Sequence, residues 1–500
     1  MPAPTDLSWW QRGAIYQIYP RSFADSDSDG IGDLQGVRSR LDHLVALGVE
    51  ALWLSPFYRS PMADFGYDVS DYEDVDPVFG TLAEFDALVD AAHARGLRVI
   101  VDWVPNHTSD RHPWFRDRAR RHWYVWRDRP NGWRTQFSAS GPAWTLDPHS
   151  GQWYLHSFLP AQPDLNWDEP EVEAAMHDTL RFWLRRGVDG FRMDVIYRIA
   201  KDPLLGENEP ERRHDQDWPT IAARLKAIRR VLEEFGSERI AVGELYLPTQ
   251  ADLARYINSG DQLHMVHNFH FLQQPWQARA FRATVEEFMA LLEPGAWPAW
   301  CLGNHDHSRV ASRYGPRAVR VAAMLLVTLR GTPFFFQGEE LGLADVPVPP
   351  DRIVDVDGRD PERGPIPWEP PSTAGPGAGF TRGEPWLPVD PAAERVNAAA
   401  QDSNPDSTLN LYRALLALRR AQPDLQGGEL RFFDAGDADV LAYTRGDGHL
   451  VALNFAAAPR RAALPSAARV VLSTRSERTP GELVEAELEL AADEGVVLRR

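Results

Sequence analysis

The strongest constraint on the fold is a recurring order of three segments: an amphipathic helix, a glycine and a short apolar run. Thr81 and Glu84 form a capping-box pattern that predicts the start of a helix, Gly96 predicts its end, and the apolar run RVIVDWV follows. In the same way FWLRRG leads into VDGFRMDV, and VLEEFG leads into SERIAVGEL. Helices that alternate with continuous apolar strands are typical of a parallel sheet buried on both faces. The sequence therefore predicts an α/β protein.

Near the start of the chain, apolar residues at helical spacing from Leu34 to Leu47 predict one helix, which Gly48 ends before the run ALWLS. Eight helix-and-strand units of this kind favour a (β/α)8 barrel. A doubly wound open sheet is the alternative. The barrel is favoured because polar residues follow several different strands, where barrel enzymes carry their sites. The eight expected strands are Ile15–Tyr19, Leu52–Leu54, Val99–Asp102, Gly190–Met193, Ala241–Glu244, Met265–Asn268, Trp300–Gly303 and Phe334–Gln337.

The chain has 500 residues, which is too long for one compact core, so we expect more than one domain. Residues 1–106 and 177–423 are predicted to form the barrel. Residues 107–176, rich in Trp, Tyr, His and Pro, form too long a connection for an ordinary loop and predict a small inserted domain. A Pro- and Gly-rich stretch, 346–402, predicts a long loop near the site. Short alternating runs in 424–500 predict a C-terminal antiparallel β-sandwich.

Composition excludes several classes of protein. The net charge is −19, which argues against binding of nucleic acid or of an anionic membrane, because both need clustered Lys and Arg. The only cysteine, Cys301, is expected to be a buried packing residue, and no intrachain disulfide is possible. The N-terminus lacks the pattern of a signal peptide, and no apolar run reaches the length of a membrane span. We expect a cytoplasmic protein with a neutral substrate.

Three acids stand at or just beyond expected strand ends: Asp194 in GFRMD, Glu244 in VGEL and Asp306 in GNHD. One acid after an apolar run is usually a turn residue or a helix cap. Three at the same face of one barrel are harder to explain in that way. Cleavage of a glycosidic bond needs two carboxyl groups that flank it, and a third can stabilise the cationic transition state. The pattern indicates a glycoside hydrolase.

Several longer motifs make this indication specific. GVDGFRMDV, VGELYLP, GNHD and DWVPNHT resemble the four short conserved regions of the α-amylase family, glycoside hydrolase family 13. The segments IYQIYPRSFADSDSDGIGDLQGV, DFGYDVSDY, QPDLNW and GRDPERGPIPW resemble the branch that contains α-glucosidases and oligo-1,6-glucosidases. The similarity runs over nearly the whole chain. It implies a TIM barrel and hydrolysis of α-glucosidic bonds.

The resemblance also implies roles for the residues at the strand ends. Asp194 matches the nucleophile of the family, Glu244 the general acid/base and Asp306 the stabiliser of the transition state. Arg192 matches the arginine that orients the nucleophile. Alternation of side chains along a strand places Arg192 and Asp194 on one face, where the guanidinium would favour an ionised Asp194.

Other matches imply a closed sugar pocket. Four residues match family residues that line this pocket or contact the glucose: Asp64, Tyr67, His107 and His305. Phe158 matches a side chain that stacks on the sugar. Arg363 in GRDPER matches the arginine that pairs with the Asp64 equivalent, which would close the pocket beyond one sugar and imply exo action. Val195 follows the nucleophile, as in oligo-1,6-glucosidases, and is expected to affect the choice of linkage.

The segment DSDSDGIGD has oxygen ligands at alternating positions, as in an EF-hand loop, but Gly36 stands where an EF-hand has its final Glu. The alternative is a solvated acidic turn. The α-glucosidase branch carries a structural cation here, so a Ca²⁺ without a catalytic part is expected. Its ligands would be Asp25, Asp27, Asp29, the carbonyl oxygen of Ile31, and Asp33.

The sequence predicts a retaining, exo-acting α-glucosidase that acts on short α-1,4- and α-1,6-linked oligosaccharides. Isomaltose and maltose are the expected substrates, with sucrose as a further candidate. An α-glucosyl transferase or isomerase, of the sucrose isomerase or trehalose synthase type, would share every catalytic residue and stays open. A non-enzymatic relative, such as the barrel domain of a transporter subunit, would lack the full set of acids. Relatives commonly have Gln-Pro where this chain has His307 and Ser308, and RTPMQW in place of RGPIPW, which leaves specificity open.

Overall fold

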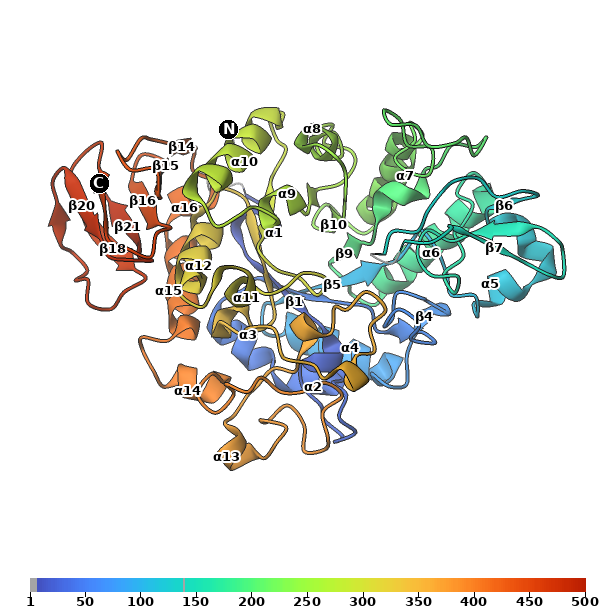
Figure 1. Ribbon diagram of the computed structural model, residues 1–500, viewed down its shortest axis with the longest axis horizontal. Coiled ribbons are helices and arrows are strands. Elements are labelled where there is room, and N and C mark those ends of the chain that lie inside the picture. The colour runs from blue at the N-terminus through green and yellow to red at the C-terminus, as the bar shows by residue number, and fades with distance from the viewer. Residues whose placement is uncertain (1–6, 138–139) are drawn as a thin grey trace.

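The computed structural model describes residues 7–137 and 140–500, and its centre is a barrel of eight parallel strands (Figure 1). A parallel bridge between His267 and Ala299 joins the two end strands of the sheet, so the barrel closes. The barrel prediction is confirmed and the open-sheet alternative is wrong. Residues 1–6, which the prediction assigned to the barrel, lie outside the described residues. In sheet order the strands are β11 (Met265–Val266), β10 (Ile240–Gly243), β9 (Gly190–Met193), β5 (Arg98–Trp103), β2 (Ala51–Leu54), β1 (Ile15–Ile18), β13 (Thr332–Phe336) and β12 (Ala299–Cys301).

Helices follow the strands along the chain and pack their apolar faces on the outside of the barrel. Every strand of the barrel is buried along its length, apart from a half-buried Arg98, because side chains fill the interior and helices cover the exterior. The main helices are α2 (Leu34–Ser39), α3 (Leu41–Leu47), α4 (Leu82–His93), α6 (Pro170–Arg185), α7 (Ile221–Glu233), α10 (Ala278–Leu291), α12 (Ala318–Thr328) and α15 (Thr408–Ala421).

The start of α4 forms as its sequence predicts. The Thr81 backbone N–H donates to the Glu84 carboxylate at 2.8 Å, and the Glu84 N–H donates back to the Thr81 hydroxyl at 3.3 Å. This reciprocal pair satisfies two N–H groups that have no partner within the helix. Gly96 follows the end of α4 with a φ of +78°, a conformation that glycine adopts without steric cost.

The helix predicted from Leu34 to Leu47 is instead two helices, α2 and α3, with a break at Arg40. The backbone of Arg40 leaves the helical region, with φ −107° and ψ 9°. Its guanidinium lies over the ring of Trp368 at 4.5 Å and donates to the Gly379 carbonyl at 3.3 Å. Both helices still bury the predicted apolar residues, so the spacing reported the buried face correctly but not the break.

The long connection between β5 and β9 carries its own small sheet. Its strands β6 (Trp126–Arg127), β8 (Trp153–Leu155) and β7 (Trp144–Leu146) are antiparallel, and α5 (Pro113–Arg116) precedes them. In Figure 1 this insertion lies at the right, at the end of the molecule opposite to the C-terminal strands. Helix α6 begins at Pro170, so it crosses the boundary predicted at 176 and 177.

The C-terminal region is antiparallel, as predicted, with a six-stranded sheet and a separate pair of strands. Leu450, Leu488 and Leu498 belong to one buried cluster that joins the two sheets. The six strands, in sheet order, are β14 (Leu430–Phe432), β15 (Val440–Arg445), β16 (His449–Asn454), β21 (Gly495–Arg499), β18 (Ala468–Ser473) and β19 (Leu483–Val484), and the pair is β17 (Arg460–Ala463) with β20 (Glu487–Leu490).

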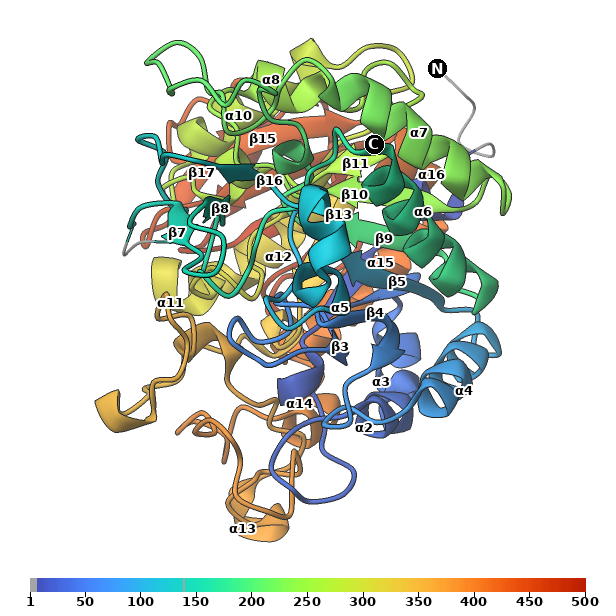
Figure 2. The same ribbon diagram turned by 90° about the vertical axis from the view of Figure 1, so that its right-hand side faces the viewer.

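The loop between β13 and α14 (Ala398–Asp402) leaves the barrel and returns. Its short helix α13 (Pro371–Ala374) lies at the lower end of both views, beyond α2 (Figures 1 and 2). On the way the loop pairs with the acidic segment near the N-terminus, where the Asp25 N–H donates to the Phe380 carbonyl at 2.9 Å. No helix among the described residues has the length and apolar character that a bilayer crossing requires.

Candidate active site

A pocket of about 340 Å³ opens at the carboxyl ends of the barrel strands. Asp194 follows β9, Glu244 follows β10 and Asp306 lies beyond β12, and all three carboxyl groups line the pocket. The carboxyl ends of the strands in such a barrel meet at one face, which brings together residues far apart in sequence. The other predicted site residues that line it are Asp64, Tyr67, His107, Phe158 and Val195.

One buried guanidinium holds two of the acids. Arg192 Nη1 donates to Asp194 Oδ1 at 2.9 Å, and its Nη2 lies 2.6 Å from Glu244 Oε1. Arg192 is 1% exposed and lies behind the pocket wall. The position follows from the strand: Arg192 and Asp194 are two residues apart, so their side chains leave β9 on the same face.

Burial raises the pKa of both acids. For Asp194, Glu244 raises the pKa further and Arg192 lowers it; for Glu244, Arg192 lowers it and Asp306 raises it. We expected Arg192 to keep Asp194 ionised, but burial and the second carboxyl group have the larger effect. Because two adjacent carboxylates repel one another, the pair is expected to hold one proton in the free protein.

Asp306 has the opposite electrostatic surroundings. Burial acts to raise its pKa, but His305, Arg359 and Arg363 together lower the pKa well below its usual value. Its Oδ1 accepts from Arg359 Nη1 at 3.0 Å and from Arg363 Nη2 at 3.1 Å. Asp306 is therefore a fixed negative charge, while the other two acids can exchange a proton.

The ion pair at the end of the pocket corrects one prediction. Asp64 Oδ1 accepts from Arg359 Nη2 at 2.7 Å, so its partner is Arg359 and not Arg363. Arg363 is 1% exposed and contacts Asp355 and Asp306 from the side away from the pocket. The two arginines are four residues apart, and the 3₁₀ turn η7 (Pro361–Arg363) directs the second one inward. Both stand in the same GRDPER motif, so the sequence offered no means of choosing between them.

Two predicted histidines differ in their access to the pocket. His107 lines it, and its Nε2 lies 3.2 Å from the Tyr67 carbonyl, to which it donates; burial lowers the pKa of His107 to about 4. His305 lies behind the pocket wall, where its ring stacks on Tyr67 at 5.5 Å and its Nε2 is 2.6 Å from the Tyr67 hydroxyl. A direct contact of His305 with a sugar stays a prediction.

Val195 has an unusual backbone for a β-branched residue. Its φ is +35° and its ψ is 42°, in the left-handed region, which costs such a residue energy. The geometry directs the Val195 N–H toward the acid/base candidate, and it donates to Glu244 Oε2 at 3.1 Å. The side chain is 5% exposed and lines the pocket. The hydrogen bond links the backbone directly after Asp194 to the Glu244 carboxyl group.

Sequence reasoning missed one buried acid of the site, Asp102. It lies near the carboxyl end of β5, is fully buried, and accepts from Arg192 Nη1 at 2.6 Å and from the Trp53 indole N–H at 3.0 Å. Burial raises the pKa of Asp102 to about 7, although both donors favour the carboxylate. The sequence could have identified Asp102 as a site residue, since it stands at a predicted strand end within DWVPNHT.

The rim holds further residues that the sequence did not identify. Phe137 packs edge-on to Phe158 at 5.6 Å, and the Arg359 guanidinium lies 5.3 Å from the Phe137 ring. Tyr246 lies two residues after Glu244 and is 38% exposed at the pocket. No periodicity marks these positions, because they come from loops. Also lining the pocket are Gln136, Tyr197 and Asp357, together with His307, which the sequence had marked as a position that leaves specificity open.

A larger cavity, about 560 Å³, lies between the insertion and the segment before α7. None of the predicted site residues lines it. Its buried cations are already neutralised, since Lys201 lies 3.0 Å from Asp164 and Arg224 pairs with Asp168. The candidate chemistry therefore belongs to the smaller pocket.

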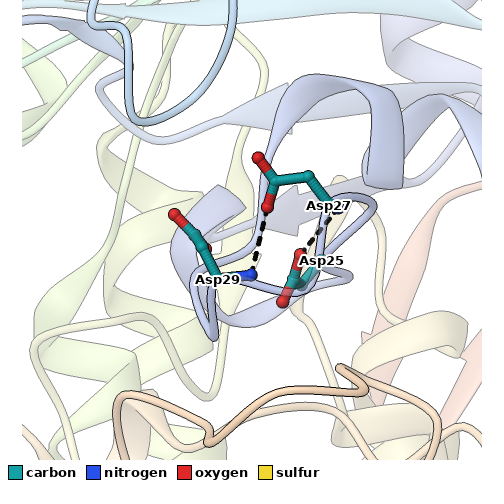
Figure 3. A group of neighbouring side chains, drawn as sticks. All are labelled: Asp25, Asp27 and Asp29. Carbon is teal, nitrogen blue, oxygen red and sulfur yellow. Dashed lines mark hydrogen bonds between the residues drawn. The ribbon is translucent and has the colours of Figure 1, made fainter.

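The predicted cation loop brings three of its acids together (Figure 3). One carboxylate oxygen from each of Asp25, Asp27 and Asp29 lies within 4.8 Å of the others. Burial and its acidic neighbours raise the pKa of Asp29, and a bound cation would favour the ionised carboxylates. Asp33 lies outside this group and caps α2, where its oxygens accept the Ser26 and Gly36 N–H groups at 2.7 Å. Carboxylate oxygens in this arrangement fit a hard cation such as Ca²⁺.

Comparison with known proteins agrees with this geometry. Residues 17–428 match the sequence model of the α-amylase catalytic domain. A Rhizobium meliloti protein named "Probable alpha-glucosidase" is 41% identical, over 89% of this chain and 88% of the relative. The oligo-1,6-glucosidase of Parageobacillus thermoglucosidasius is 35% identical, over 89% and 90%. The crystal structure of an α-glucosyl transfer enzyme superposes with a TM-score of 0.91 at 37% identity, over 99% of this chain and all of that one.

Proposed function

The chain belongs to the α-amylase family, and on this premise we propose that it is a retaining, exo-acting α-glucosidase. Its family and its α-glucosidase relatives make it a glycoside hydrolase. It would release α-glucose from the non-reducing end of short α-1,4- and α-1,6-linked oligosaccharides. The observation that carries the proposal is the single guanidinium of Arg192, which contacts Asp194 and Glu244 in one pocket.

The mechanism follows from the two carboxyl groups. Glu244 donates its proton to the glycosidic oxygen while Asp194 attacks the anomeric carbon, and the C–O bond to the leaving sugar breaks. A covalent β-glucosyl ester on Asp194 results. Glu244, now ionised, takes a proton from water, which attacks the same carbon and releases α-glucose. The fixed charge of Asp306 stabilises the cationic sugar in both transition states.

Exo action rests on the Asp64–Arg359 pair. These two side chains contact each other at 2.7 Å at one end of the pocket and would hold the outer hydroxyls of the terminal glucose. A chain that continued past that glucose would have to displace a buried ion pair, which is costly. The pocket therefore favours one sugar unit beyond the cleaved bond.

Isomaltose and maltose are the substrates that we favour, with sucrose as a third. The rigid Val195 side chain would border the second sugar. An α-1,6 bond has an additional CH₂ hinge that lets this sugar turn away from Val195, whereas an α-1,4 bond does not. Isomaltose should therefore be at least as good a substrate as maltose. The oligo-1,6-glucosidase relative supports this order.

We further propose a structural Ca²⁺ at the loop of Asp25, Asp27 and Asp29, with the Ile31 carbonyl as a further ligand. The loop also binds the segment after β13, since the Thr381 hydroxyl donates to Asp25. A cation would stabilise the contact between the N-terminal loop and the segment that carries Arg359. It would supply no catalytic group.

Trapping of the covalent intermediate tests the proposal. A 5-fluoro-glucosyl fluoride should add one fluoroglucosyl unit to the protein, and mass spectrometry of peptides should locate it on Asp194. NMR of the first product from isomaltose should show α-glucose before mutarotation. A β-anomer as first product, or a label on another residue, would contradict the retaining mechanism assigned to these acids.

A second candidate function, α-glucosyl transfer or isomerisation, is favoured by the similarity to the α-glucosyl transfer enzyme. The same glucosyl-Asp194 ester would then react with a sugar hydroxyl instead of water. Chromatography of the products from sucrose and from maltose distinguishes the two. Free glucose in stoichiometric yield indicates hydrolysis, and new disaccharides in place of glucose indicate transfer.

A further inference from the structure

His307 borders the pocket immediately after Asp306. Asn304 and His307 are joined by an antiparallel bridge, so residues 304–307 form a tight turn. Within it the Asp306 N–H donates to Asn304 Oδ1 at 3.0 Å. The turn fixes the position of the His307 backbone relative to the acid Asp306.

Aromatic packing fixes the orientation of the His307 ring. The ring stacks on Phe269 of α9 (Phe269–Leu272), with 5.5 Å between centroids and 24° between planes. Phe269 stacks in turn on Tyr246, at 4.5 Å and 14°. The imidazole is therefore an ordered part of the pocket wall, connected through Phe269 to the loop that carries Glu244.

The hydrogen bonds of the turn determine which ring nitrogen carries the proton. His307 Nδ1 lies 2.8 Å from Asn304 Oδ1. That oxygen already accepts the Asp306 N–H, so it is the carbonyl oxygen of the amide, and Nδ1 must be the donor. Burial lowers the pKa of His307, although Asp306 opposes this, so the ring is neutral near pH 7. Nε2 then carries a lone pair, and it has no hydrogen-bond partner among the described residues.

His307 lies on the side of the pocket where the leaving sugar would bind. The terminal glucose would lie against Asp64 and Arg359, at the closed end of the pocket. The leaving oxygen must lie next to Glu244, which protonates it. The His307 ring stacks on Phe269, and Phe269 stacks on Tyr246, two residues after Glu244. His307 therefore borders the part of the pocket where the second sugar would lie.

We propose that His307 Nε2 accepts a hydrogen bond from a hydroxyl group of the second sugar, and thereby favours sugars over other leaving groups. The inference rests on the proposed α-glucosidase function. It assigns a specificity residue to the leaving-sugar site, and it makes a neutral, hydroxyl-bearing sugar the preferred group there.

The test compares two substrates that share the terminal glucose. Isomaltose has a leaving sugar with hydroxyl groups, whereas the leaving group of p-nitrophenyl α-glucoside has none to donate. His307→Phe keeps an aromatic ring for the stack but removes the acceptor. The ratio of kcat/KM for isomaltose to that for p-nitrophenyl α-glucoside should fall about tenfold, the equivalent of ~1.4 kcal/mol for one lost hydrogen bond.

Two further variants separate the acceptor from the packing. His307→Gln carries a carbonyl oxygen at about the distance of Nε2 and should restore most of the ratio. His307→Asn reaches only as far as Nδ1 and should not. His149→Phe, at an exposed histidine, is the matched control and should leave the ratio as in the wild type. An unchanged ratio in His307→Phe, or an equal loss in the Gln and Phe variants, would overturn the proposal.

A binding measurement keeps this test independent of turnover. In the Asp194→Ala background, calorimetric titration should show that His307→Phe weakens isomaltose about tenfold relative to glucose. Equal weakening of both sugars, or of neither, would overturn the role of His307. Failure of the wild type to cleave either substrate would instead overturn the α-glucosidase proposal, because it concerns the acids and not His307.

Discussion

Arg359 Nη2 donates to Asp64 Oδ1 at 2.7 Å, across 295 positions of the chain. The contact joins the segment after β13 to the segment after β2. The same guanidinium reaches Asp306 at 3.0 Å and Asp355 at 2.7 Å. The Arg359 side chain thus connects the end of the pocket to a candidate catalytic acid. Its replacement would remove three ion pairs at once.

Replacement of this arginine should impair catalysis strongly. Arg359→Ala leaves Asp64 buried without its ion-pair partner, which costs at least ~2 kcal/mol, so kcat/KM for isomaltose should fall by about thirtyfold or more. Initial rates with isomaltose and maltose measure it. Arg382→Ala, an exposed arginine on the same loop, should behave as the wild type. Activity of Arg359→Ala within about threefold of the wild type would show that the pair does not hold the sugar.

The nucleophile assignment predicts a near-complete loss of turnover. Asp194→Ala closes the covalent route and should lower kcat by several orders of magnitude, with an unchanged circular dichroism spectrum. The exposed Asp447→Ala serves as the matched control. Retention of more than about a tenth of the wild-type kcat, a barrier change of only ~1.4 kcal/mol, is incompatible with a nucleophilic Asp194.

The dependence of activity on pH should report the electrostatics of Glu244. Burial raises the pKa of Glu244, Arg192 lowers it, and the negative charge of Asp306 raises it. Removing that charge in Asp306→Asn should lower the pKa, so Glu244 loses its proton at a lower pH. The alkaline limb of kcat/KM for p-nitrophenyl α-glucoside should therefore move to lower pH. A limb that stays in place or moves upward would contradict this coupling.

Cation removal should reduce stability with little effect on activity. Chelation by EDTA removes a ligand that contributes about 2.7 kcal/mol if free Ca²⁺ is at ~100 times its Kd. The melting temperature should fall by calorimetry, and Asp29→Ala should reproduce the fall and abolish its dependence on Ca²⁺. Rates at low temperature should barely change. No Ca²⁺-dependent shift in the wild type would identify the loop as an acidic turn only.

The choice of linkage should depend on Val195. Val195→Ala removes two methyl groups from a side chain that is rigid about χ1, and it should raise kcat/KM for maltose relative to isomaltose. Discrimination by about one methyl group amounts to roughly 10–200-fold. Parallel kinetics on both disaccharides measure the ratio. An unmoved ratio, or a wild type without activity on isomaltose, would refute this account and leave the hydrolase assignment intact.

Local patterns were sufficient to predict much of the fold. Apolar runs predicted all eight barrel strands, because a strand buried on both faces is mostly apolar. The same patterns did not reveal the break at Arg40. At the break the Arg40 guanidinium contacts the ring of Trp368, more than 300 residues away in sequence. A helical period reports which face is buried, not whether the helix is continuous.

The sequence by itself determined which residue types stand at the strand ends, and therefore the three acids and Arg192. Arg192 and Asp194 share one face of β9 because side chains alternate along a strand, which is a local property of the chain. Only the tertiary structure decided that Arg359, and not Arg363, reaches Asp64, and that Phe269 orders the His307 ring. These contacts join segments that come together when the barrel closes and the loop after β13 folds back over it. Loop geometry of this kind has no sequence period, so it exists only in the folded chain.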